Sequence, residues 1–333
     1  MVEEALLAER AGFHSIQVPD RHGRAELFPG ALQLLTILAR ETERVAIGSC
    51  ALVLTAYEPM HVAAECAAID SISRGRLYMT LARGWNPVDW AYFGIPQERL
   101  LRRFLEGLEI LRKANLGKRF SYLGEFFRVD DALLTPRPYQ RDGFPIWGGA
   151  MFTPAIRRTA DIGECWVCAP FPLLKETWEE QAGAYRRRAE ELGKQPFIVL
   201  MRDGWVSDGM NRAAQEWATH YVEEMKVMLR GGILTHHPDF ETEAALTLDR
   251  VRDPWSSAPG KSASRSSSTT SKSMESTTSA CASACPPALP SKPSASRSFA
   301  SARRSLRTSP SAILPRCTRR SRKVRAGERA CER

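Results

Sequence analysis

Residues 144–163, FPIWGGAMFTPAIRRTADIG, contain a strand, a turn and a helix in sequence. The apolar run ends at Gly148 and Gly149, and Thr153 and Pro154 follow as an N-cap residue and a first helical residue. A helix N-terminus presents free N–H groups and the positive end of a dipole, so this turn is a candidate phosphate site. An ordinary tight strand–helix turn has the same pattern, and the stretch alone does not separate the two.

The same unit recurs along the chain. Six short apolar runs alternate with amphipathic segments such as 100–114 and 178–193. This alternation is typical of βαβ units around a parallel sheet, and runs that are apolar almost throughout indicate strands covered on both faces. The six runs are 14–20, 45–54, 76–84, 144–150, 164–170 and 197–206.

The predicted architecture is an α/β fold, a (β/α)8 TIM-type barrel that is incomplete. Residues 1–255 have about the length that such a barrel needs, roughly 250 residues, but they supply only six clear strands. They also open on a helix, 2–11, rather than on a strand, so we expect the first and last strands to be missing. A doubly wound sheet is the alternative, although no G-x-G-x-x-G turn follows an early strand.

Composition changes abruptly after Trp255. Residues 256–333 hold 16 of the 47 Lys and Arg against three acidic residues, so the basic charge of the chain belongs to this segment. They hold only seven Val, Ile, Leu, Met or Phe, too little apolar surface to offset the entropy of ordering. We expect 1–255 to be the folded unit and 256–333 a disordered tail. The tail has neither interleaved aromatic residues nor an amphipathic pattern, so no nucleic-acid or membrane partner is expected.

The cysteines of the first 255 residues indicate structure rather than chemistry. Cys165 and Cys168 have a CxxC spacing, but they lie in an apolar run and have no second ligand pair. We interpret them as buried structural thiols and expect no metal site. No signal peptide and no apolar run of membrane-spanning length occurs, which predicts a cytoplasmic protein.

Candidate reactive groups follow the strands, because a parallel barrel carries its site at the C-terminal strand ends. The first end gives Asp20-Arg21-His22, where a histidine beside a carboxylate suits acid–base chemistry, although a solvated loop histidine fits too. The second end has small residues where a flat ligand could approach, and the third has Arg83 for an anionic group and Trp85 for a planar one.

Four stretches together resemble the bacterial luciferase-like, flavin-dependent monooxygenases. They are AERAGFHSIQVPDRH (8–22), ARETERVAIGSCALVLTAYEP (39–59), DSISRGRLYMTLARGWNPVDWAYFGIP (70–96) and PRPYQRDGFPIWGGAMFTPAIRRTADIGECW (136–166). The resemblance covers essentially residues 1–255. It implies a (β/α)8 barrel that binds reduced FMN or, in some relatives, a deazaflavin.

The resemblance also implies site residues. Ser49, Cys50 and Ala51 match a bulged strand with a non-prolyl cis peptide behind the flavin ring, and Arg83 matches an arginine that contacts the flavin phosphate. The remaining cofactor-binding residues that it implies are Gly149, Ala150, Met151, Phe152 and Thr153. Phe152 and Ala155 stand where the family has hydroxyl groups, which favours backbone contacts to the phosphate.

The catalytic positions depart from luciferases proper, which have an acidic residue and then two histidines. Asp20, Arg21 and His22 occupy these positions, so Arg21 replaces the first histidine and His22 is the remaining candidate. Light emission from an aldehyde is not expected. Ala82 occupies the family's reactive-thiol position, so no thiol chemistry is expected there.

The implied function is oxygenation of a small organic substrate with reduced FMN and O2. No nicotinamide site is visible, so a separate flavin reductase is the expected partner, and relatives suggest a homodimer if the barrel is intact. Two alternatives stay open: hydride transfer with a deazaflavin or flavin on the same fold, and an inactive, frame-shifted product. The second is motivated by the tail, because 273–283 can be reread one base back as a strand of the family type.

Overall fold

The computed structural model describes residues 1–22, 30–169, 175–201, 206–230, 239–240 and 242–248. The expected tail, 256–333, lies outside the described residues, and so do 202–205 at the end of the sixth predicted strand run.

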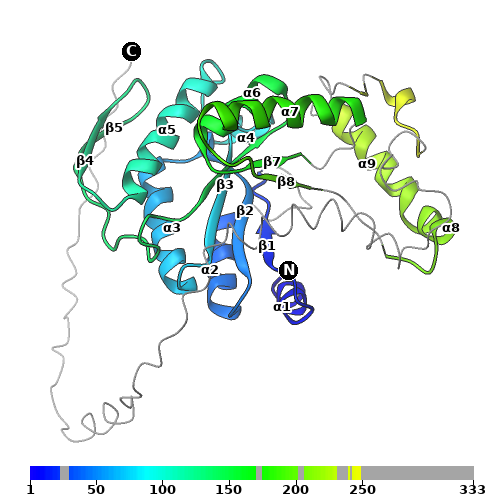
Figure 1. Cartoon of the computed structure of the whole chain (residues 1–333), viewed down its shortest axis with the longest axis horizontal. Coiled ribbons are helices and arrows are strands. Elements are labelled where there is room, and N and C mark those ends of the chain that lie inside the picture. Colours follow the sequence, from blue (N-terminus) through cyan, green and yellow to red (C-terminus); the bar gives the residue numbers. More distant parts are fainter. Residues whose placement is uncertain (23–29, 170–174, 202–205, 231–238, 241, 249–333) are drawn as a thin grey trace, which may run out of the picture. The chain divides into compact units, whose positions relative to one another are not determined.

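Six parallel strands form the main sheet (Figure 1), in the spatial order β1-β2-β3-β6-β7-β8. The strands are β1 (Ser15–Val18), β2 (Ala46–Val53), β3 (Leu77–Ala82), β6 (Ile146–Ala150), β7 (Trp166–Cys168) and β8 (Ile198–Leu200). Each predicted run contains one of them. The spatial order follows the chain order without a reversal, which excludes the doubly wound alternative.

One helix precedes the first strand, and helices follow every strand of the main sheet. The helices are α1 (Val2–Arg10), α2 (Ala31–Glu41), α3 (Pro59–Ser73), α4 (Pro87–Tyr92), α5 (Leu100–Asn115), α6 (Thr153–Ile162), α7 (Lys175–Glu191), α8 (Met210–Ala213) and α9 (Thr219–Arg230). Three short turns are η1 (Leu54–Ala56), η2 (Ala214–Ala218, a π-helical turn) and η3 (Glu243–Ala245). None of the described helices is both long and apolar enough to cross a membrane.

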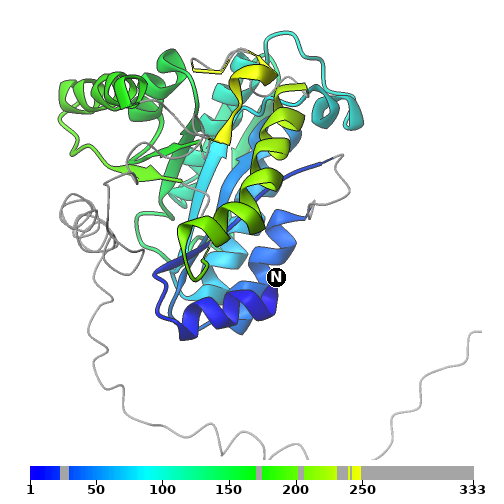
Figure 2. The same cartoon turned by 90° about the vertical axis from the view of Figure 1, so that its right-hand side faces the viewer.

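The sheet is curled into a half-barrel of the TIM type, as the sequence predicts. The curl brings the two sides of the sheet together: Cys50 Sγ in β2 lies 3.1 Å from Met201 Sδ, just after β8, although three strands separate β2 from β8. Helices α2, α3 and α5 lie on the outer side, and α9 lies on the opposite, inner side in both views (Figures 1 and 2).

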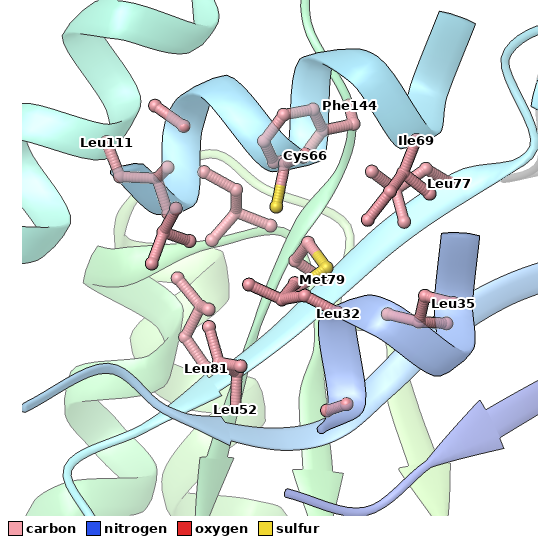
Figure 3. Close-up of a cluster of buried hydrophobic side chains, with 14 of the residues drawn as sticks. Leu32, Leu35, Leu52, Cys66, Ile69, Leu77, Met79, Leu81, Leu111 and Phe144 are labelled. Carbon is pink, nitrogen blue, oxygen red and sulfur yellow. The ribbon is translucent and has the colours of Figure 1, made fainter. Parts of the chain in front are cut away.

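The main core lies between the outer face of the sheet and its helices (Figure 3). Alternate residues of β3 point into it, with Leu77, Met79 and Leu81 almost fully buried against α2, α3 and α5. A second core joins β7 and β8 to α6 and α7 around Trp166. Cys165 and Cys168 are both buried, and neither forms a disulfide with another described cysteine, in agreement with structural thiols.

Helix α1 is joined to the start of β2 by one carboxylate. Glu9 accepts backbone hydrogen bonds from Glu43, Arg44 and Val45 at 2.6 to 3.0 Å, measured to Oε1. Burial alone would raise the pKa of Glu9, but these N–H donors outweigh it and lower the pKa. Gly12 ends α1 at φ +88°, a left-handed conformation that favours glycine.

A hairpin outside the main sheet was not predicted from the sequence. Strands β4 (Phe120–Leu123) and β5 (Arg128–Ala132) pair antiparallel, and the turn between them rests on α5. The buried carboxylate of Glu106 accepts the N–H groups of Glu125 and Phe126 at 3.0 and 2.9 Å. The hairpin lies on α5 rather than at the strand ends.

Candidate active site

Strand β2 has the backbone irregularity that the resemblance implies. Its pairing with β3 shifts register between Ser49 and Leu52, and the Cys50–Ala51 peptide bond is cis. The hydroxyl of Ser49 is fully buried and donates to the carbonyl of Thr80 at 2.9 Å, so it is used within the sheet. The backbone at Cys50 and Ala51 is therefore what this strand offers to a ligand.

The inner face next to the bulge is lined by very small side chains. A Cβ added to Gly149 would lie 3.4 Å from Ala51 Cβ, 3.6 Å from Ala82 Cβ and 3.6 Å from Thr80 Cγ2. Three strands, β2, β3 and β6, thus meet at a point where none presents a bulky group. A planar ligand could approach the backbone closely here.

The end of β1 carries a buried carboxylate–imidazole pair. Asp20 Oδ1 lies 3.2 Å from His22 Nε2, and Asp20 Oδ2 accepts the N–H of Val53 at 3.0 Å. The hydroxyl of Tyr57 donates to Asp20 Oδ1 at 2.8 Å and lies 3.4 Å from His22 Nε2. Phe93 packs edge-on against the His22 ring at 4.9 Å. The structure therefore brings Asp20 and His22 together, as the sequence predicts.

The charges around His22 favour its protonated form. The hydrogen bond to Asp20 raises the pKa of His22 above its ordinary value, and this outweighs the opposing effect of burial. The negative charge of Asp89, on α4, acts in the same direction. Burial, together with the charge of Asp20, raises the pKa of Asp89 itself. In the described part of the chain, the other ring nitrogen of His22, Nδ1, has no hydrogen-bond partner.

Arg21 points across the site toward β3. Its guanidinium carbon lies 5.3 Å from the centre of the Trp85 ring, a cation–π arrangement. Burial raises the pKa of the neighbouring Cys50 thiol to about 12, with Arg21 opposing the shift. The thiol therefore stays protonated at neutral pH, which makes it a poor nucleophile.

The β6–α6 turn presents free amides, with a change in detail from the prediction. Helix α6 has Phe152 as its N-cap and Thr153 as its first residue, so Thr153 is not the N-cap and no side chain caps the helix. The reason is that Phe152 already has the extended backbone of a cap residue, at φ −115° and ψ 142°. Among the described residues, the N–H groups of Met151, Phe152 and Thr153 have no acceptor.

The carbonyls of the same turn are fixed from behind. The indole of Trp166 donates to the carbonyl of Ala150 at 3.0 Å, and Gln181 on α7 donates to the carbonyl of Met151 at 3.2 Å. These bonds hold the turn so that its amides stay available on the opposite side.

Arg83 follows β3 beside this turn. Leu81 pairs with Gly148, so Arg83, two residues on, lies level with Ala150 at the end of β6. Its side chain is exposed, and its polar contact within the described ranges is from Nε to the carbonyl of Gly84 at 3.5 Å. Within the described residues no carboxylate pairs with it. The Arg83 guanidinium and the free amides of the β6–α6 turn therefore lie at the C-terminal ends of two adjacent strands, β3 and β6.

Several residues of the site were missed by sequence reasoning. Tyr57 and Asp89 follow the second and third strands, and their place as polar residues after a strand end is the signal that the sequence carries for them. The inner-side cluster formed by Met225, Phe240 and Leu246 packs against Trp85 and other residues at the strand ends. No local signal in the sequence connects α9 with those strand ends.

The fold and this geometry define a parallel half-barrel protein with a candidate ligand site at the C-terminal ends of its strands. The chain belongs to the luciferase-like monooxygenase family, whose model matches residues 1–281.

Relatives in this family use different cofactors. The chain is 27% identical to the oxygenase component of a flavin-dependent trigonelline monooxygenase from Acinetobacter baylyi over 62% of this chain and 59% of that protein. It is 26% identical to a glucose-6-phosphate dehydrogenase from Mycolicibacterium fortuitum that depends on the deazaflavin coenzyme F420, over 63% and 60%. The chain spans 42% to 59% of the length of the first four curated relatives that it matches.

Solved structures share the fold. The oxygenating constituent of 3,6-diketocamphane monooxygenase from Pseudomonas putida, a type II Baeyer-Villiger monooxygenase solved with FMN, has a TM-score of 0.64 at 17% identity. The match covers 75% of this chain and 77% of that chain. At this identity the likeness concerns the fold alone.

Proposed function

We propose that this protein binds reduced FMN at the C-terminal strand ends and uses O2 to oxygenate a small organic substrate. The observation that carries the proposal is the combination, on adjacent strands, of the register shift between Ser49 and Leu52, the small-residue floor at Gly149 and the uncapped α6 beside Arg83. The first two features suit the flat ring of a flavin mononucleotide, and the third suits its terminal phosphate.

The residues present fit such a group. The floor made by Ala51, Ala82 and Gly149 is flat because none of the three extends beyond a methyl group. The amides of Met151, Phe152 and Thr153, together with the Arg83 guanidinium, would hold the phosphate. When bound, reduced FMN supplies the electrons that activate O2, which no protein side chain supplies.

The protein's own residues have three tasks in this proposal. His22, whose protonated form is favoured by the hydrogen bond to Asp20, offers a hydrogen bond from Nδ1 to an oxygen that gains negative charge during the reaction. Tyr57 and the Val53 amide keep the Asp20 carboxylate in place. The cluster of Met225, Phe240 and Leu246 against Trp85 excludes water from the inner side.

Hydride transfer with a deazaflavin on the same site is the second candidate, because a relative of comparable identity depends on that coenzyme. Anaerobic titration with reduced FMN and with reduced coenzyme F420 separates the two. We expect tighter binding of FMN, and incorporation of one 18O atom from labelled O2 into an organic product. Preferential binding of the deazaflavin would refute the FMN assignment.

The partners follow from the same proposal. A separate flavin reductase would supply reduced FMN, as the name of the trigonelline enzyme's oxygenase component suggests for that system. We also propose a homodimer and a cytoplasmic location. Product formation from NADH, FMN and substrate only when a reductase is added would support the two-component arrangement.

We further propose that 1–255 form the flavin-binding unit and that 256–333 are a frame-shifted tail without a role in binding. Equal FMN affinity of the full chain and of a variant shortened after Trp255 is the expected result. Loss of FMN binding on shortening would show that the tail contributes. Resequencing the DNA around codon 255 tests the frame directly, and stop codons throughout the shifted frame would contradict it.

A further inference from the structure

Thr55, in the turn that follows β2, joins two segments of the site through one hydroxyl. The residue is 1% exposed. Its Oγ1 donates to the carbonyl of Arg83 at 2.7 Å and accepts the indole N–H of Trp90, on α4, at 2.9 Å. The hydroxyl proton is therefore committed to Arg83, and the Trp90 bond fixes the direction in which it points.

Thr55 is itself held in place from outside the site. Its carbonyl accepts Nε of Arg103, on α5, at 2.9 Å, and the Arg103 guanidinium carbon lies 4.5 Å from the centre of the Phe127 ring. Thr55 thus links two packed helices, α4 and α5, to the end of β3 by hydrogen bonds.

The peptide after Arg83 is fixed as well. Gly84 has φ +86°, and a Cβ there would lie 2.6 Å from Val53 Cγ1 and 3.2 Å from the Trp90 ring. Because the chain turns in a left-handed conformation against two packed side chains, the Arg83 backbone has little freedom. The side chain of Arg83, by contrast, is exposed and has no ion pair in the described part of the chain.

We infer that Thr55 and Trp90 are positioning residues that aim Arg83 at the terminal phosphate of the flavin. The inference rests on the proposed function. A long flexible side chain binds an anion well only if its starting direction is set, since ordering it costs conformational entropy. The hydrogen bond from Thr55 to the Arg83 carbonyl sets that direction without touching the ligand.

The test compares FMN with riboflavin, which has the same ring but no phosphate. Thr55→Val keeps the shape and removes the hydroxyl, Thr55→Ser keeps the hydroxyl, and Arg83→Gln removes the charge. Dissociation constants for both flavins are measured by fluorescence quenching on the full chain, with thermal unfolding followed in parallel.

The expected results are specific to the phosphate. Arg83→Gln weakens FMN binding by about 10- to 100-fold, as for the loss of a charge-assisted bond, and leaves riboflavin binding unchanged. Thr55→Val weakens FMN binding by about 5- to 10-fold with riboflavin unchanged, and Thr55→Ser restores FMN binding. The double variant with Arg83→Gln binds FMN no worse than Arg83→Gln alone, since both act through one side chain.

Other outcomes overturn the inference. Equal weakening of both flavins by Thr55→Val, or full additivity with Arg83→Gln, would mean that Thr55 only supports the fold. If Thr55→Val does not fold, Trp90→Phe removes the N–H that orients the hydroxyl, and a selective loss of FMN affinity is again required. If the unaltered chain binds neither flavin, the proposed function is refuted together with this inference. If the unaltered chain binds FMN but Thr55→Val does not weaken FMN relative to riboflavin, only this inference is refuted.

Discussion

Replacing Phe152 with aspartate should move stability and cofactor affinity in opposite directions. Phe152 is the N-cap of α6, has the extended backbone of a cap residue and makes no side-chain cap hydrogen bond. The residue is 38% exposed and belongs to none of the hydrophobic clusters formed by the described residues, so its removal loses little packing. An aspartate at this position can accept a free N–H of the first helical turn.

The two effects have estimable sizes. A good N-cap contributes about 1 kcal/mol, and a carboxylate at the positive end of the helix dipole adds about 0.3–1 kcal/mol, so Phe152→Asp should stabilise the fold by about 1–2 kcal/mol. The same carboxylate occupies amides that the phosphate needs and repels its charge. A loss of about 1.4 kcal/mol or more in FMN binding, or roughly tenfold, is therefore expected.

The measurements are equilibrium denaturation and an FMN titration, with Phe152→Asn as the matched control. Asparagine caps the helix without a charge, so it should stabilise the fold similarly and weaken FMN binding less. Riboflavin affinity should be the same in all three proteins. An aspartate variant that is more stable and binds FMN as tightly as the unaltered chain would refute the assignment of the phosphate to the α6 amides.

Three further predictions follow from the geometry. Gly148→Ala places a Cβ 2.7 Å from Thr159 Cγ2 and should lower the melting temperature of the protein. Gly149→Ala has room in the fold, but its methyl group occupies the floor beside Ala51 and Ala82. This variant should therefore keep its melting temperature and lose flavin affinity in a titration. Glu9→Ala leaves three backbone N–H groups without their acceptor and should cost about 2–4 kcal/mol in denaturant unfolding at pH 7. Because the pKa of Glu9 is lowered in the fold, its contribution is present above about pH 4.5 and is lost as the pH falls, so the difference should shrink in acid. Because the pKa of His22 is raised in the fold, its charge contributes stability below about pH 6.5, and this contribution is lost as the pH rises through the folded-state pKa. In denaturant unfolding, the destabilisation caused by His22→Gln should therefore shrink as the pH rises, and a destabilisation that grows with pH would contradict this.

The parallel sheet could be predicted from the sequence because each strand is a short, almost wholly apolar run. Leu77, Met79 and Leu81 face the helices while Tyr78 and Thr80 face inward, and both faces are buried. The hairpin around Glu106 could not be predicted in this way. Its contacts with α5 come from a carboxylate that is distant along the chain and from a hydrophobic cluster around Ile110, Phe127 and Val129, rather than from local periodicity.

The site could be predicted in part for a related reason. Asp20 and His22 are neighbours in the sequence, so strand-end reasoning alone brings them together. The bonds that define their environment come from Val53 and Tyr57, more than thirty residues away, and depend on the register of β1 with β2. The cap position of α6 was assigned one residue too late, because Phe152 has no side-chain signal of a cap.

Gly148 and Gly149 are adjacent in the chain, yet they are constrained by different neighbours. The space beside Gly148 is filled by Thr159 of α6, while the space beside Gly149 opens onto Ala51 and Ala82 on the inner face. Substitutions at the two positions should therefore accumulate independently during evolution. A homologue with a larger residue at the first position should show repacking of its helix, and one with a larger residue at the second should bind the proposed planar ligand less tightly.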